Sequence, residues 1–224
     1  VFENVVGMLS ASPDGTPIVD KIHSAFKDAG YTVIDDFKQA VFDVADFGIP
    51  QHRKRVIILG VRSDISKNDL NVESLSNTII DEFYNVVMPA YRLKAKRRTV
   101  RDAIGDLPKL TPLPVVIRQN GQKYSHGPIT SSGVLNHTPR FHSERDQKIF
   151  RLLEEDIESG RNKYVSTDSL KELYTQFTGK KSNIHKYYVL RWDEQSNTIP
   201  AHLYKDGMRH IHPDSKQARS ITVR

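Results

Sequence analysis

A short apolar run, Val56–Val61, constrains the fold of this chain more than any other feature of its sequence. It is the longest apolar stretch in the chain, and Arg55 and Arg62 flank it. A run of this length is typical of a strand buried on both faces of a sheet, and it is far shorter than the roughly 18 residues that a membrane-spanning helix needs. It therefore predicts a central strand of an α/β sheet, and no membrane association is expected.

The segments before this run alternate between strand and helix patterns. Residues 1–6 predict a buried strand, and residues 31–42, rich in β-branched and aromatic side chains, predict one or two strand pieces. Between them, Thr16 followed by Pro17 is typical of a helix start, and Gly30 is typical of a helix end. We therefore expect the first third of the chain to form half of an open α/β sheet.

After residue 63 the sequence becomes polar, basic and rich in proline and glycine. The expected elements are a surface linker over 63–77, a short amphipathic piece at 79–87, helices at 99–107, 143–160 and 167–177, loops with short strands over 108–140, and strand and loop over 181–224. Thr99 and Asp102 form a capping-box pattern, and Ser143 is typical of an N-cap. This change predicts three parts. Residues 1–84 form one domain, residues 85–214 form a smaller loop-rich domain, and residues 215–224 return to the first.

The basic residues are unevenly distributed. The chain has 33 Lys and Arg against 27 Asp and Glu, a net charge of +6 that many ordinary enzymes also carry. Any single basic cluster is more often a solvated surface than a binding site. Three clusters in the later part of the chain nevertheless favour a nucleic-acid partner: 94–101, 180–186 and 205–224.

The chain contains no cysteine. This excludes disulfides, cysteine-based zinc sites and a cysteine nucleophile supplied by this chain. His202, His210 and His212 lie close together in the sequence, but no cysteine or carboxylate stands at ligand spacing beside them. No metal site is predicted.

Three short segments carry most of the functional signal: Phe2–Val5, Asp46–Arg55 and Arg219–Arg224. Each is weak alone, because a carboxylate at a strand end is often an ion-pair partner and alternating basic residues before a strand are usually solvated. In this order and separation they resemble the Glu-Asn-Val, Gln-x-Arg-x-Arg and Arg-x-Leu-Thr-x-Arg motifs of the DNA cytosine-C5 methyltransferase family, with Ile221 in place of Leu. The resemblance touches most of the chain and is weakest over 63–98.

The resemblance implies methylation of cytosine C5 in double-stranded DNA with S-adenosylmethionine as cofactor. The fold it implies is α/β, namely the C-terminal half of a Rossmann-like methyltransferase sheet plus a smaller, mixed, loop-rich target-recognition domain. The catalytic residues it implies are Glu3, Arg53 and Arg55. A carboxylic acid against ring nitrogen 3 stabilises the activated cytosine, and arginines can hold its carbonyl oxygen and a flanking phosphate. Arg53 and Arg55 alternate with Lys54, so an extended backbone turns both to one side.

A further set of residues is expected to contact DNA, whose target base must leave the stack to be reached. Residues 197–209 contain a Thr-Ile pair that resembles part of the family's target-recognition region, and their cationic side chains suit phosphates or guanine edges. Gly207 is expected to allow a tight turn there. An ordinary hairpin with a solvated tip is the alternative. The expected DNA contacts are Gln51, Thr198, Lys205, Arg209, Arg219 and Thr222.

Two parts of the family pattern are missing. The cysteine nucleophile and the glycine-rich loop that binds S-adenosylmethionine lie upstream of Glu-Asn-Val in the family, so no cofactor-binding residue is assigned here. We expect a fragment that is inactive alone, or a natural split enzyme whose complementing chain carries the nucleophile. A noncatalytic nucleic-acid-binding module and a tRNA-modifying relative are the alternatives. No signal peptide opens the chain, so a cytoplasmic location is expected, with nucleoid association if the source is bacterial.

Overall fold

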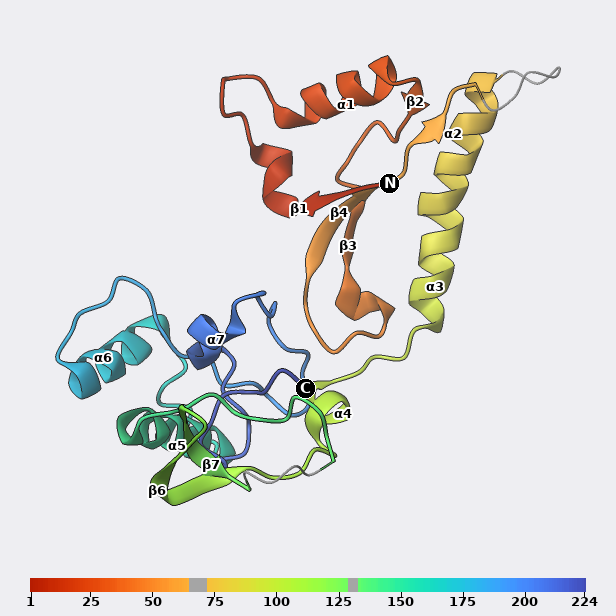
Figure 1. The fold of residues 1–224 in the computed structure, drawn as a ribbon. Helices are drawn as coiled ribbons and strands as arrows, with labels where there is room; N and C mark the ends of the chain where they lie inside the picture. The colour runs from red at the N-terminus through yellow and green to blue at the C-terminus, as the bar shows by residue number, and fades with distance from the viewer. Residues whose placement is uncertain (65–71, 129–132) are drawn as a thin grey trace. The chain divides into compact units, whose positions relative to one another are not determined.

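The computed structural model describes residues 1–64, 72–128 and 133–224, which divide into two compact units, Val1–Arg98 and Thr99–Arg224 (Figure 1). The expected domain boundary at residue 84 falls inside a helical segment that packs on the first unit, and it stays a prediction. Residues 215–224 pack within the second unit here, and their expected return to the first domain stays a prediction.

The first unit is built around a three-stranded antiparallel sheet in the order β1-β4-β3. Its strands are β1 (Phe2–Val5), β4 (Lys54–Ile58) and β3 (Val41–Asp43), and a separate pair joins β2 (Tyr31–Thr32) to β5 (Val61–Arg62). The apolar run does supply the central strand, with Val56 and Ile58 fully buried. The first strand is half-buried rather than buried, since its residues alternate between exposed and partly covered.

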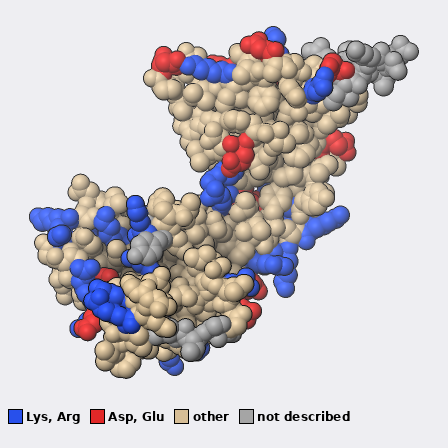
Figure 2. Space-filling model, in the orientation of Figure 1, with Lys and Arg blue, Asp and Glu red and all other residues tan. Residues whose placement is uncertain are grey.

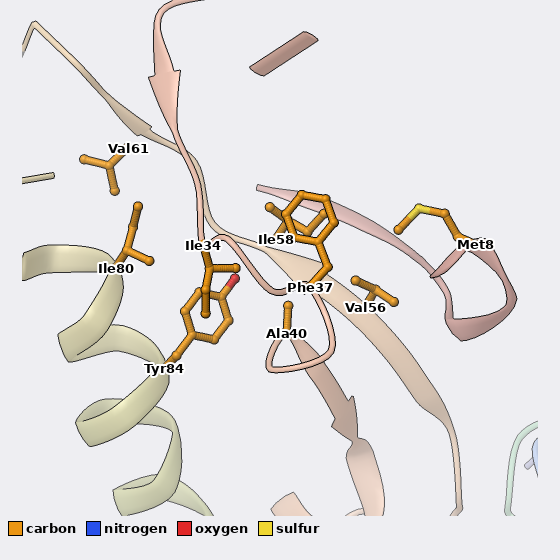
Figure 3. Packing of buried hydrophobic residues seen from close by; sticks show 9 residues of the cluster. All are labelled: Met8, Ile34, Phe37, Ala40, Val56, Ile58, Val61, Ile80 and Tyr84. Atoms are coloured by element: carbon orange, nitrogen blue, oxygen red, sulfur yellow. The ribbon is translucent and has the colours of Figure 1, made fainter. Parts of the chain in front are cut away.

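Helical segments cover this sheet. They are η1 (Val6–Ser10), α1 (Ile18–Asp28) and η2 (Val44–Phe47). The first full helix begins one residue later than expected, at Ile18, with Pro17 as its N-cap and no side-chain capping bond. Its partly buried face packs on a core formed by Met8, Ile34, Phe37, Ala40, Val56, Ile58, Val61, Ile80 and Tyr84 (Figure 3).

The expected linker over 63–77 is wrong from residue 72 onward, and residues 65–71 of it lie outside the described part. The chain is helical through α2 (Val72–Glu82), the π-helical turn η3 (Phe83–Val87) and α3 (Met88–Lys94). Polar composition misled the prediction, because Ser76 is buried with its hydroxyl donating to the Arg62 carbonyl at 3.3 Å. Tyr84 anchors the segment by donating to the Ile57 carbonyl at 2.8 Å and accepting from the Leu59 amide at 2.9 Å.

The second unit is mostly helical and irregular. It contains α4 (Val100–Ile104), β6 (Thr111–Gln119), β7 (Gln122–Gly127), α5 (Glu144–Glu158), α6 (Thr167–Thr178), α7 (Leu203–Asp206) and η4 (Gly207–Arg209). Helices are present at each expected position, 99–107, 143–160 and 167–177, although the first spans only Val100–Ile104. The Thr99–Asp102 capping box is confirmed. The strands β6 and β7 form a hairpin whose Asn120–Gly121 turn has positive φ at both residues, as a type I′ turn requires.

The core of the second unit lies between α5, α6 and the later chain. Its buried members are Ile149, Phe150, Leu153, Leu170, Leu173, Tyr187, Val189, Ile211 and Ala218. Single β-bridges join Ile211 to Val189 and to Ser220, so the last segment is held by isolated backbone contacts instead of a continuous sheet. Among the described residues, no helix is both long and apolar enough to cross a membrane.

Candidate functional site

The first group of candidate residues meets at the junction of β1 and β4. These strands pair with Glu3 opposite Ile57 and Val5 opposite Arg55, which places Glu3 and Arg55 diagonally on the same face. The Arg55 Nε donates to the Glu3 Oε1 at 2.8 Å. Glu3 keeps about half of its side chain exposed (54%), whereas Arg55 is mostly covered (17% exposed). A reachable carboxylate is thus held by a sheltered guanidinium.

Arg53 and Gln51 stand in the loop that leads into β4. Arg53 and Arg55 are partly covered while His52 and Lys54 are exposed, so the expected alternation is present. Within the described chain the Arg53 guanidinium has no hydrogen-bond or ion-pair partner, which leaves it available to a ligand. Gln51 is also partly covered, and its backbone amide donates to the Ile49 carbonyl at 2.8 Å.

Asp43, at the end of β3, holds this loop. Its carboxylate accepts from the amides of Arg53 at 2.9 Å and Ala45 at 3.2 Å, and it contacts the His52 Nδ1 at 3.0 Å. Burial alone would raise the pKa of Asp43, but the hydrogen bonds from His52, Arg53 and Ala45 outweigh it and lower that pKa. The charged carboxylate therefore fixes the backbone that presents Arg53.

The other side of the loop is held by close packing. Gly48 has φ +81°, and a Cβ at this position would lie 3.0 Å from the Lys96 carbonyl oxygen. Both the conformation and the contact require glycine here. The Asp46 Oδ2 also accepts from the Arg92 Nη2 at 2.9 Å, which ties the loop to α3. The loop that carries Gln51 and Arg53 is consequently anchored to two separate elements of the first unit.

The second group of candidates lies on the segment 197–209. It is loop and turn over 197–202, as expected, and helical at α7 and η4, so it does not form a hairpin. Lys205 and Arg209 are exposed and carry the charge expected of DNA contacts. Thr198 is exposed as well, and its carbonyl lies 3.3 Å from the His210 Nε2. Gly207 has φ −55°, so the tight turn expected there is absent.

Arg219 and Thr222 are buried within the second unit, with 2% and 6% of their surfaces exposed. The Arg219 guanidinium donates through Nε and Nη2 to the Gln217 Oε1 at 3.1 and 2.9 Å, and through Nη1 to the Ser220 carbonyl at 3.0 Å. The Thr222 hydroxyl lies 3.0 Å from the His137 Nδ1. Their expected DNA contacts stay predictions, and their burial and hydrogen bonds favour a role in holding the last segment.

Sequence reasoning considered His210 and His212 only as possible metal ligands and missed that histidines are buried around this segment. The Ser220 amide donates to the His142 Nε2 at 3.1 Å, which requires that nitrogen to be an unprotonated acceptor. Burial lowers the pKa of His142 to about 3, that of His126 to about 4 and that of His212 to about 2. The sequence gives no signal that His126 and His142 lie near the last segment, because only the fold brings them there. No group of three potential ligands among the described residues is arranged to hold a metal ion.

Charge separates the two units clearly. The first contains 13 Lys and Arg against 13 Asp and Glu, whereas the second contains 20 against 14, so the whole excess of +6 lies in the second unit. Lys and Arg side chains are prominent on the face of the second unit that Figure 2 shows. This distribution suits a polyanionic partner for the second unit.

Two of the cavities formed by the described residues lie within the second unit. The larger, of about 640 Å³, is lined by residues 121–124, 138–141 and 220–223 and by Leu203 of α7. The smaller, of about 220 Å³, is bordered mainly by apolar and tyrosine side chains, with Arg191 and Glu194 at its edge. Only the larger reaches the size of a typical ligand site, roughly 300–1,000 Å³.

Comparison with known proteins identifies relatives along the whole chain. The family model for C-5 cytosine-specific DNA methylases matches residues 1–224. The Type II methyltransferase M.Bpa9945I of Bacillus paralicheniformis is 32% identical over 235 residues, which cover 100% of this chain and 50% of that relative. M.XorII of Xanthomonas oryzae is 30% identical over 57% of this chain and 24% of its own length, and M.MthTI of Methanothermobacter thermautotrophicus is 33% identical over 54% and 29%.

The matched relatives are longer than this chain, which spans about half of the length of M.Bpa9945I. Full coverage of the chain by the family model agrees with the three motif segments at positions 2–5, 46–55 and 219–224. The chain belongs to the C-5 cytosine-specific DNA methylase family.

Proposed function

We propose that the protein methylates carbon 5 of cytosine in double-stranded DNA. In this proposal the first unit holds and activates the target base through Glu3, Arg53 and Arg55, and the basic second unit binds the duplex. The observation that carries the proposal is the half-exposed Glu3 carboxylate, positioned by Arg55 on the face that β1 and β4 share.

The chemistry of cytosine explains why these side chains suit the task. Carbon 5 becomes nucleophilic only after a group adds at carbon 6, and ring nitrogen 3 then takes up positive charge. A carboxyl group against nitrogen 3 stabilises this activated ring, a contribution typical of positioned acid and base groups. The uncommitted Arg53 guanidinium suits the carbonyl oxygen of the ring or a neighbouring phosphate, both of which accept fork-shaped hydrogen bonds.

The cofactor implied by the family is S-adenosylmethionine, which when bound would supply the methyl group. The larger cavity does not fit it, because none of the described lining residues is a carboxylate that could pair with the sulfonium and ammonium groups of the cofactor. The smaller cavity falls below the usual size of a ligand site. We therefore assign the cofactor to no residue described here.

The thiolate that attacks carbon 6 in the family is not supplied by this chain, which contains no cysteine. We propose that a segment outside these 224 residues, or a complementing chain, brings the nucleophile to Glu3. These residues alone would then bind DNA without methylating it.

The proposal is tested by Glu3→Gln in the full-length protein. An amide can neither protonate nitrogen 3 nor pair with its charge, so methyl transfer to unmethylated duplex DNA should fall on the order of 10²-fold or more. DNA binding should stay within twofold, and stability should change by less than about 1 kcal/mol, because the ion pair with Arg55 is half exposed. Transfer of labelled methyl groups and fluorescence anisotropy measure the two activities.

Asp14→Asn is the matched control, since Asp14 is another exposed carboxylate of the first unit that pairs with a cation, Lys21. It should leave methyl transfer unchanged. Full activity of Glu3→Gln would make Glu3 a structural residue and would contradict the proposed role. Strong DNA binding by a full-length protein that never transfers a methyl group would favour the noncatalytic binding module instead.

A further inference from the structure

The larger cavity of the second unit is formed by segments that are distant in the sequence. Its walls come from the hairpin turn and the start of β7 at residues 121–124, the stretch 138–141, Leu203 of α7 and the last motif at 220–223. One wall therefore belongs to the segment expected to recognise DNA, and another belongs to a family motif. A ligand in this cavity would touch both.

The lining combines positive charge with apolar and aromatic surface. Lys123 and Arg140 are its charged residues, and none of the described lining residues is acidic. The Lys123 Nζ lies 5.7 Å from the centroid of the Phe141 ring, within the range of a cation–π contact. Tyr124 adds a second ring. The occupant that matches such walls has an anionic group and a flat, largely apolar body.

Arg140 connects the cavity to the recognition segment by close packing. A Cβ at Gly207 would lie 3.0 Å from the Arg140 Nη1 and 3.1 Å from the Ser220 Oγ. The absence of a side chain at Gly207 thus lets Arg140 pass close to the backbone between α7 and η4. This close approach, and not a tight turn, is the reason for glycine at this position. The position of the Arg140 guanidinium is consequently coupled to the conformation of the recognition segment.

Resting on the proposed function, we propose that this cavity binds one nucleotide of the DNA that has left the duplex stack, other than the target cytosine. Its phosphate lies between Lys123 and Arg140, and its base packs against Phe141. A cavity of this size accommodates a single nucleotide, and a base exposes its flat faces only when it is unstacked. The target cytosine does not match, because the described lining contains no carboxyl group to meet nitrogen 3.

The test uses the full-length protein and three duplexes of one sequence: fully paired, with one unpaired adenosine, and with one unpaired abasic nucleotide. Dissociation constants are measured by fluorescence anisotropy. The duplex with the unpaired adenosine should bind on the order of tenfold more tightly than the paired duplex, because the energy of unpairing this base has already been spent. The abasic duplex is as deformable but offers no base, so it should bind like the paired one.

Phe141→Leu keeps an apolar side chain but removes the ring, and it should reduce the preference for the unpaired adenosine to less than twofold. Lys123→Gln should weaken binding of that duplex severalfold. Its matched control is Arg118→Gln. Arg118 lies opposite Lys123 in the register of the β6–β7 hairpin and is exposed, but it does not line the cavity. The control should change binding by less than twofold.

The outcomes separate this inference from the proposed function. Equal binding of all three duplexes by a protein that methylates DNA would overturn the inference alone. Equal preference for the adenosine and abasic duplexes, or equal losses in Lys123→Gln and Arg118→Gln, would also overturn it, since flexibility or general charge would then explain the binding. Failure to bind any duplex would overturn the proposed function as well.

Discussion

The two units hold their irregular segments in place by different means. In the first, the loop before β4 is anchored at its edges by Asp43 and by Arg92, and the interior is almost entirely apolar. In the second, the last segment has only isolated bridges, and buried polar side chains take over the hydrogen bonds that a sheet would provide. A segment without strand partners must satisfy its backbone groups through side chains, and burying those side chains makes the unit sensitive to their charge.

The largest expected effect is a loss of stability of the second unit in acid. The buried His126, His142 and His212 have folded-state pKa values of about 4, 3 and 2, against 6.5 when unfolded. Below pH 6.5 these histidines therefore bind protons in the unfolded chain but stay neutral in the folded chain. Stability should fall by up to about 1.4 kcal/mol per pH unit for each histidine as the pH drops from 6.5 to 4. Urea unfolding followed by Trp192, the single tryptophan, reports this unit.

Glu154 on α5 opposes this slope. It is buried, both carboxyl oxygens lack hydrogen-bond partners within the described chain, and burial raises its pKa to about 9, with the charges of Glu158 and Asp214 adding to the shift. Because the pKa of Glu154 is higher in the folded state than in the unfolded state, Glu154 contributes to stability. This contribution is fully present below pH 4.5 and is lost as the pH rises towards 9. Glu154→Gln should remove the decline in stability above pH 7, whereas Glu155→Gln, at an exposed neighbouring position, should not.

The contrast between the units can be tested by amide exchange, corrected for intrinsic rates. It would be contradicted if exchange in β4 of the first unit depended on pH as strongly as exchange in the second unit.

The next largest effect is expected for Arg219→Met. The change removes the guanidinium that donates to Gln217 and Ser220, and it should lower the stability of the second unit by about 3 kcal/mol, because buried acceptors lose a charged donor. Urea unfolding followed by Trp192 measures it. The exposed Arg209→Met is the control and should cost less than about 0.5 kcal/mol. Similar small losses in both variants would return Arg219 to the candidate DNA contacts.

The smallest effect is expected in the first unit for Tyr84→Phe. The variant keeps the ring in the core but loses the hydroxyl that bridges Ile57 and Leu59, at a cost of about 1 kcal/mol. Faster amide exchange across β4 measures it, and Tyr91→Phe, two-thirds exposed on α3, should leave that exchange unchanged. A cost as large as that of Arg219→Met would show that the first unit depends on buried polar groups as strongly as the second.

Sequence patterns predicted the elements whose stability is local or uniformly apolar. The run Val56–Val61 identified the central strand, and the capping residues Thr99 and Ser143 located two helix starts, because a cap acts on the amides that follow it within one turn. The alternation of Arg53, Lys54 and Arg55 was also readable, since strand geometry has a period of two. The helix from Val72 was missed because its buried Ser76 looks like a surface residue until Arg62 is placed beside it.

The pairing of Glu3 with Arg55 and the burial of Arg219 were decided by tertiary structure. The motifs identified the family and proposed catalytic residues, but the contact between positions 3 and 55 depends on the antiparallel register of β1 and β4, which sequence spacing does not encode. Arg219 was assigned to DNA from its charge, yet the second unit surrounds it with Gln217, Ser220 and Glu154. Local patterns determine strands, helices and motifs because their causes lie within a few residues; burial and long-range contacts depend on which segments meet, and only folding settles that.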